Sequence, residues 1–260
     1  MAALQIVFLM YHELELPLRA LCHAEAGYVR YILPLDDFRQ QLRWMKDAGF
    51  RGINVSEALL YPGEPSVCIT FDDGCETDLI AGAPALREFG FHATFYVTAG
   101  FLDTPGYMSW AQLRELDTQG FEIGCHSMTH PYLSDLSDPE LDREIGDAKL
   151  KIEQILGHSI EHFSCPGGRY DSRTLESARR AGFRSVANSR FHPNSAATGQ
   201  YELGRVAMLR GMPLEEFEAI CQGRGLWSKR LQDGTRHAIR RLLGNRAYDR
   251  VRAALLGGAE

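Results

Sequence analysis

The chain has 260 residues, of which 45% are hydrophobic and 24% are charged. This composition is typical of a globular protein and excludes a disordered, collagen-like or coiled-coil chain. The formal net charge is −6, so the chain as a whole offers no basis for nucleic-acid binding. The length suits one large domain or two small ones.

The N-terminus and the cysteines indicate where such a chain resides. No apolar run approaches the ~20 residues of a membrane-spanning helix. Residues 1–10 lack basic residues, and no small-residue cleavage site follows, so we interpret this run as a buried strand and not as a signal peptide. The six cysteines show no C-x-x-C spacing, which favours reduced, packed thiols. We therefore expect a cytoplasmic protein.

Short apolar runs alternate with amphipathic stretches along most of the chain. Strands are predicted at residues 6–10, 66–70, 93–98, 121–125, 162–165 and 183–187. Helices are predicted at residues 36–48, 79–89, 109–120, 138–157 and 171–181. This alternation predicts a parallel sheet with helices outside it: a closed or nearly closed β/α barrel, with a doubly wound open sheet as the alternative. In either fold, functional groups gather at the carboxyl ends of the strands.

The last 40 residues differ from the rest. Residues 221–260 contain nine basic residues against three acidic ones, a net charge of +6. We therefore divide the chain into a barrel over residues 1–220 and a basic helical extension over 221–260. The extension, with a helix at 236–243, either packs on the acidic body or docks on an anionic lipid or carrier at the inner membrane face.

Three polar clusters begin where predicted strands end. They are Thr-Phe-Asp-Asp-Gly at 70–74, His-Ser-Met-Thr-His at 126–130 and Ser-Cys-Pro-Gly-Gly-Arg-Tyr-Asp at 164–171. Taken alone, each also fits a turn, a helix cap or a surface histidine pair. In a barrel, however, strand ends converge on one mouth, so Asp73 and His126 can meet although they are 53 positions apart.

One carboxylate and two imidazoles at that mouth form a three-ligand set for a divalent metal, with positions left for water and substrate. The adjacent aspartate is then free to accept a proton from water that the metal acidifies. The order of the clusters resembles that of the polysaccharide deacetylases, carbohydrate esterase family 4, which contain the NodB homology domain. The resemblance covers about residues 11–205, and it implies a distorted (β/α)7 barrel.

Carried over to this chain, the resemblance implies that Asp72 is the catalytic base. It implies that Asp73, His126 and His130 bind one divalent ion, commonly zinc and in some members cobalt, nickel or iron. The third cluster matches the family's P-[FY]-G motif. There the Gly167 N–H would help to hold the oxyanion of the tetrahedral intermediate.

Two departures from the family pattern point to a subgroup. At the position of Ser164, many relatives have an arginine that pairs with the catalytic aspartate. This chain also lacks the late L-x-H motif, which supplies the general-acid histidine in those relatives. Both absences resemble the subgroup related to poly-N-acetylglucosamine deacetylases, which opens with Tyr-His after its first strand, here Tyr11 and His12. His12 could protonate the leaving amine or be a strand-end histidine without a role, and Arg205 could replace the missing arginine.

The predicted function is a metal-dependent hydrolase that removes N-acetyl groups from an amino sugar in a glycan or glycolipid precursor. Its partner would be an N-acetylated saccharide or a lipid-linked saccharide. Two alternatives stay open: a deacylase or deformylase of a non-sugar amide, and a glycan-binding barrel without catalysis. The sequence does not specify the sugar, the linkage, the native metal or the oligomeric state.

Overall fold

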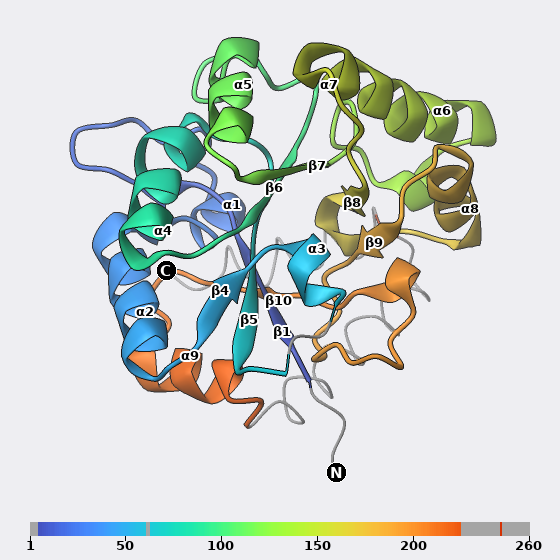
Figure 1. Cartoon of the computed structure of the whole chain (residues 1–260). Coiled ribbons are helices and arrows are strands. Elements are labelled where there is room, and N and C mark those ends of the chain that lie inside the picture. Colours follow the sequence, from blue (N-terminus) through green and yellow to red (C-terminus); the bar gives the residue numbers. More distant parts are fainter. Residues whose placement is uncertain (1–4, 61–62, 225–244, 246–260) are drawn as a thin grey trace.

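The computed structural model describes residues 5–60, 63–224 and 245, and Figure 1 draws their path. The strands are β1 (Val7–Tyr11), β2 (Leu14–Glu15), β3 (Leu33–Pro34), β4 (Arg51–Ile53), β5 (Ser66–Phe71), β6 (Thr94–Val97), β7 (Glu122–Cys125), β8 (His162–Ser164), β9 (Ser185–Ala187) and β10 (Val206–Ala207). The α-helices are α1 (Ala26–Val29), α2 (Leu35–Asp47), α3 (Val55–Ala58), α4 (Ala83–Phe89), α5 (Trp110–Thr118), α6 (Asp138–Asp142), α7 (Ala148–Leu156), α8 (Ser172–Arg180) and α9 (Leu214–Cys221). Shorter turns are the π-turns η1 (Asp78–Gly82) and η3 (Arg143–Asp147) and the 3₁₀ turns η2 (Leu133–Asp135), η4 (Pro166–Gly168) and η5 (Gln200–Glu202).

The main sheet is parallel throughout, in the order β10-β1-β5-β6-β7-β8-β9, with β4 added beside β5. A single bridge between Ala187 and Leu203 links β9 back to the segment that leads into β10. The sheet thus curls into a nearly closed, distorted barrel, and the predicted (β/α)7 fold is confirmed. The larger helices lie around the outside of the strands (Figure 1).

The hydrophobic core has two parts, as expected of a curled sheet with helices on its convex face. The larger part joins the helices to the outer strand face, and it includes the α2 residues Phe38, Leu42 and Met45, as the helical spacing predicts. A smaller cluster fills the concave side, where Phe8, Cys68 and Tyr96 meet residues of α3. Neither part includes the aspartates and histidines of the polar loops that follow the carboxyl ends of β5 and β7.

Local sequence signals explain most helix boundaries. Ser109 and Gln112 form the predicted capping box of α5. The long helix predicted from residue 138 begins with Ser137 as its cap instead of Asp138, and a π-turn at η3 divides it. The helix predicted at 79–89 likewise starts as the π-turn η1. Strands β2, β3, β4 and β10 and helices α1, α3 and α9 were not predicted, because all but α9 are too short to show a periodic pattern.

The predicted domain boundary at 220/221 falls at the end of α9, which packs on α2 through Trp44 and Phe217. The predicted basic helix at 236–243 lies outside the described residues. Within the described part of the chain, no helix is both long and apolar enough to cross a membrane.

Candidate metal centre and active site

The first polar loop leaves β5 through a constrained turn. The Asp72 N–H donates to the Tyr11 carbonyl at 2.9 Å, which extends the β1–β5 pairing past the strand end. Asp73 has a φ of 79°, a left-handed conformation that costs a non-glycine residue about 1–3 kcal/mol. The turn directs Asp72 toward Arg205 and Asp73 toward two histidines.

Asp73, His126 and His130 form a cluster whose ligand atoms lie within 4.8 Å of one another. Asp73 Oδ1 is 3.6 Å from His126 Nε2 and 3.5 Å from His130 Nε2. This oxygen is buried and has no hydrogen-bond partner in the protein. Burying a carboxylate oxygen without a hydrogen bond costs free energy unless a cation binds it. One carboxylate with two imidazoles is a ligand set that zinc accepts. The donor set therefore fits a divalent metal ion.

Hydrogen bonds fix the two histidines: His126 through its second ring nitrogen, and His130 through its backbone N–H. His126 Nδ1 lies 2.9 Å from the Ser164 carbonyl oxygen, so Nδ1 carries the proton and Nε2 is left for a metal. Burial lowers the pKa of His126 to about 4, although Asp72 acts in the other direction, so the imidazole is in its neutral, ligating form. The His130 N–H donates to Ser127 Oγ at 3.0 Å and fixes the loop between the histidines.

Asp72 is paired with Arg205 at the base of the same mouth. The Arg205 guanidinium donates to both Asp72 oxygens at 2.7 Å, and both residues are buried. Burial alone would raise the pKa of Asp72, but Arg205 outweighs it and holds that pKa well below its usual range. Arg205 also donates to Ser164 Oγ at 2.6 Å, to Thr70 Oγ1 at 3.1 Å and to the Asn188 carbonyl at 3.2 Å. Ser164, at the position where many relatives have arginine, thus accepts a hydrogen bond from Arg205, which comes from a later segment of the chain and pairs with Asp72.

His12 and Gly167 each lie shortly after the carboxyl end of a strand, β1 and β8 respectively. His12 follows β1, its Nδ1 is buried without a hydrogen-bond partner, and its ring centroid lies 5.1 Å from that of Tyr31. Burial lowers the pKa of His12, while Asp73 and Asp72 raise it, so the ring lies within the field of the metal cluster. Gly167 is exposed at the tip of η4 with a φ of 58°.

Two residues that the sequence analysis did not single out support the cluster. Tyr28 donates its hydroxyl to Asp73 Oδ2 at 3.1 Å. Glu144, on η3, accepts the Met128 and Thr129 N–H groups at 3.0 and 2.8 Å and the Thr129 hydroxyl at 2.6 Å. No local pattern marks either residue, since each reaches the site from a separate element.

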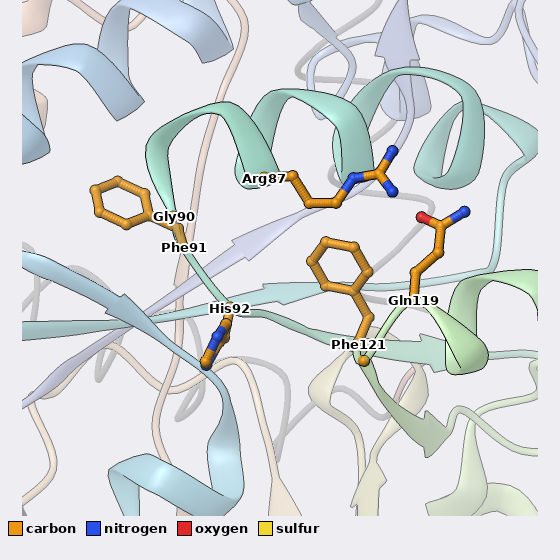
Figure 2. Close-up of a pocket in the computed structure, with 7 residues that line it drawn as sticks. Arg87, Gly90, Phe91, His92, Gln119 and Phe121 are labelled. Atoms are coloured by element: carbon orange, nitrogen blue, oxygen red, sulfur yellow. The ribbon is translucent and has the colours of Figure 1, made fainter.

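Other polar groups lie away from this mouth. Figure 2 shows a pocket lined by Arg87, Gly90, Phe91, His92, Gln119, Gly120 and Phe121. These residues precede β6 and β7, so the pocket lies at the amino ends of the strands, at the opposite end of the sheet from the metal cluster. His92 pairs there with Glu57 at 2.8 Å and His158 pairs with Asp117 at 3.0 Å, so both are structural in their contacts.

Comparison with known proteins gives the same family as the motifs. The family model described as polysaccharide deacetylase matches residues 61–186. The chain is 27% identical to the Bacillus subtilis protein YxkH over 196 residues, 73% of this chain and 70% of that protein. It is 32% identical to the chitooligosaccharide deacetylase of Azorhizobium caulinodans over 132 residues, which are 50% of this chain and 61% of that protein. It is 32% identical to the peptidoglycan-N-acetylglucosamine deacetylase of Bacillus cereus over 124 residues, which are 47% of this chain and 56% of that protein.

Solved structures extend the similarity over more of the chain. The Streptococcus pyogenes deacetylase PplD, solved in complex with acetate, superposes with a TM-score of 0.76 and 25% identity and covers 85% of this chain and 99% of that one. IcaB from Ammonifex degensii gives a TM-score of 0.69 at 23% identity, with 84% of this chain and 97% of that one covered, which supports the fold. With the Asp-His-His cluster at the strand mouths, the chain is similar to the polysaccharide deacetylases in the sequence of residues 61–186, in its fold and in its candidate metal site.

Proposed function

We propose that the chain is a metal-dependent N-deacetylase that acts on an amino sugar within a glycan or glycolipid precursor. The observation that carries the proposal is that two adjacent aspartates beside His126 each have a further partner of a different kind. Asp73 joins His126 and His130, while Asp72 forms a bidentate pair with Arg205. A metal-binding protein without catalysis needs the first arrangement only.

In this proposal each residue has one task. An ion held by Asp73, His126 and His130 supplies a Lewis acid and acidified water. Asp72, kept ionised and oriented by Arg205, takes a proton as the water oxygen bonds to the acetamide carbon.

The remaining steps need a donor for the oxyanion and a proton for the amine. The Gly167 N–H donates to the oxyanion of the tetrahedral intermediate. The C–N bond then breaks, His12 gives a proton to the departing nitrogen, and acetate and a free amino sugar leave. His12 supports this role by its position after β1, at the same end of the barrel as the metal cluster.

The subgroup is proposed on the same residues. Tyr11-His12 at the end of β1, serine in place of arginine at position 164 and the absence of a late L-x-H motif resemble the poly-N-acetylglucosamine deacetylases. We therefore propose an N-acetylglucosamine-type saccharide, free or lipid-linked, as the substrate class, with zinc as the ion.

Location is a separate proposal that rests on charge. The +6 segment at 221–260 supports a cytoplasmic enzyme that meets a lipid-linked saccharide at the anionic inner membrane face. Cell fractionation of the full chain and of a variant with its basic residues neutralised tests this placement.

Acetate release from a panel of N-acetylated saccharides, with and without chelator, tests the activity. Chelator-sensitive release from a saccharide, and not from simple acetamides or formamides, is the expected result. Release from non-sugar amides alone would favour the deacylase alternative. Saccharide binding without acetate release at any metal tested would favour a non-catalytic glycan-binding barrel.

A further inference from the structure

A second group of metal-binding side chains lies beside the first. Glu13, Cys22 and Cys75 place one carboxylate oxygen and two sulfurs within 4.8 Å of one another. Glu13 and Cys75 are buried and Cys22 is half-buried. In the part of the chain that the structure describes, this cluster and the Asp73 cluster are the two groups of this kind.

The separation of the two sulfurs distinguishes a metal site from a disulfide. Cys22 Sγ lies 3.7 Å from Cys75 Sγ. A disulfide requires about 2.05 Å. Two thiolates bound at ~2.3 Å to one tetrahedral ion lie ~3.8 Å apart. The two sulfurs therefore have the spacing of two corners of a tetrahedral metal site.

The polar contacts of the cluster leave ligand atoms available. Both Glu13 oxygens accept the Cys22 backbone N–H at 3.0 Å, which holds the carboxylate against the loop that carries the thiol. Cys22 Sγ donates to the Gly106 carbonyl at 3.1 Å, and Tyr28 Oη lies 3.9 Å from Cys75 Sγ. A Cβ at Gly106 would lie 2.7 Å from Cys22 Sγ, so only glycine permits this approach.

An unpaired buried carboxylate next to the cluster calls for a cation. Asp78 is fully buried, and neither of its carboxylate oxygens has a hydrogen-bond partner. Arg19, the nearby arginine, is already paired with Glu76 at 2.5 Å. Acidic groups gathered in the interior without a cation are costly, and a divalent ion removes that cost.

We propose that Glu13, Cys22 and Cys75 bind a second divalent ion of the thiolate-selecting class, such as Zn²⁺. Binding forms one carboxylate–metal and two sulfur–metal bonds, and the two thiol protons are released to solvent. The ion ties the loop after β1 to the turn that follows Asp73 and Gly74. Because Tyr28 contacts both Cys75 and Asp73, it also steadies the ligand of the first site.

Cobalt titration of the full-length protein, stripped of metal and kept in a phosphine reductant, tests the proposal. Thiolate–cobalt bonds give an intense near-ultraviolet absorption band that carboxylate and imidazole ligands do not give. We expect the wild type to bind one Co²⁺ with this band and another without it. Cys22→Ser and Cys75→Ser should each abolish the band, and Glu13→Gln should weaken Co²⁺ binding by ~10–100-fold.

Two variants separate this site from the first. Asp73→Asn should keep the band and lose the other ion, so the result does not depend on catalytic activity. Cys221→Ser, a change to a buried thiol on α9 outside both clusters, should keep both ions. If Cys75→Ser does not fold, the half-buried Cys22 decides the outcome.

Absence of the band in the wild type, or its persistence in Cys22→Ser, would overturn the proposal. Equal alkylation of Cys22 and Cys75 with and without Co²⁺ in the same reductant, detected by mass spectrometry, would overturn it as well.

Discussion

Asp72 and Asp73 are adjacent in the chain, yet their carboxylates have opposite surroundings. Asp72 accepts two hydrogen bonds from Arg205, while Asp73 Oδ1 accepts none. The left-handed backbone at Asp73 lets both carboxylates face one mouth, whereas successive side chains in an extended strand point to opposite faces of the sheet. The strain at this residue is thus tied to having a base and a metal ligand at one mouth.

Asp72→Asn tests the assignment of the base. The change keeps the shape but removes the proton acceptor, so turnover should fall by ~10²–10⁴ while the bound metal is retained. Metal analysis measures the bound ion, and acetate release measures turnover. Circular dichroism confirms folding, because the amide N–H of the introduced asparagine would face the N–H groups of Arg205 and could destabilise the fold. Loss of metal together with activity would mean that the two aspartates have the reverse roles.

His12→Ala tests the proton donor. An amide needs a proton on its departing nitrogen, whereas an activated phenyl acetate loses phenolate without one. The variant should therefore lose far more activity on an N-acetyl saccharide than on the ester. Equal losses on the two substrates would remove His12 from the mechanism, and His158→Ala, which changes an exposed histidine paired with Asp117, is the control.

At the scale of elements, the loop that joins His126 to His130 is held by the π-turn η3, which lies outside the barrel. Glu144 on η3 accepts two backbone N–H groups and one hydroxyl from residues 128–129, directly before His130. The positive φ of Ser127 and of His130 shows how tightly this loop turns. A helix that packs on the sheet therefore also positions a metal ligand.

Glu144→Ala should loosen this loop and weaken metal binding by ~10–100-fold, the usual effect of removing a group that orients a ligand. Competition with a chelating dye measures the affinity. Asp147→Asn changes an exposed acid on the same turn and should leave the affinity unchanged. Equal affinities in wild type and Glu144→Ala would show that the loop is held by its own backbone.

The amino end of the barrel contains a separate buried polar network. Glu122 accepts the Val55 N–H at 3.1 Å and the Ser56 N–H at 3.3 Å, and so holds the start of α3. His162 Nε2 lies 2.8 Å from Ser56 Oγ and 3.4 Å from Glu122 Oε1. Burial opposes ionisation of Glu122, but the hydrogen bonds from His162 and Ser56 prevail and lower its pKa.

Because that pKa is lowered, the ionised Glu122 stabilises the fold above its unfolded pKa of ~4.3, and this contribution is lost as the pH falls through the lower folded pKa. Glu122→Gln should cost about 1–3 kcal/mol of unfolding free energy at pH 7. The difference from wild type should shrink below pH ~4. Urea unfolding across this pH range measures the difference in unfolding free energy, and Glu215→Gln, a change to an exposed residue, is the control. A difference that does not depend on pH would contradict an ionised Glu122.

At the scale of the whole molecule, the concave side of the barrel is filled by large side chains that require a close backbone approach. Tyr96 is fully buried and lies against Gly124 of the neighbouring strand β7. A Cβ at Gly124 would lie 2.5 Å from the Tyr96 ring and 3.0 Å from the His162 carbonyl oxygen. Neither neighbour can move freely inside a packed barrel.

Gly124→Ala should therefore destabilise the fold by about 1–3 kcal/mol through overpacking. Gly146→Ala is the matched control, because its Cβ meets nothing within 4 Å in a helical turn. That change should stabilise by about 0.5–1 kcal/mol. Thermal unfolding of both variants checks the opposite signs, and destabilisation by both would point to strain at η3.

The sequence alone determined six of the ten described strands, most helices and the polar loops, because apolar periodicity and caps are local properties. The parallel barrel followed from their alternation, and it explains why Asp73 and His126 meet. The tertiary structure decided what depends on contacts between distant segments. It placed Arg205 on Asp72, Tyr28 on Asp73 and Glu144 on the loop before His130. It also brought Cys22 to Cys75, a pair for which the spacing of cysteines gave no signal, because only closure of the barrel sets distances between loops.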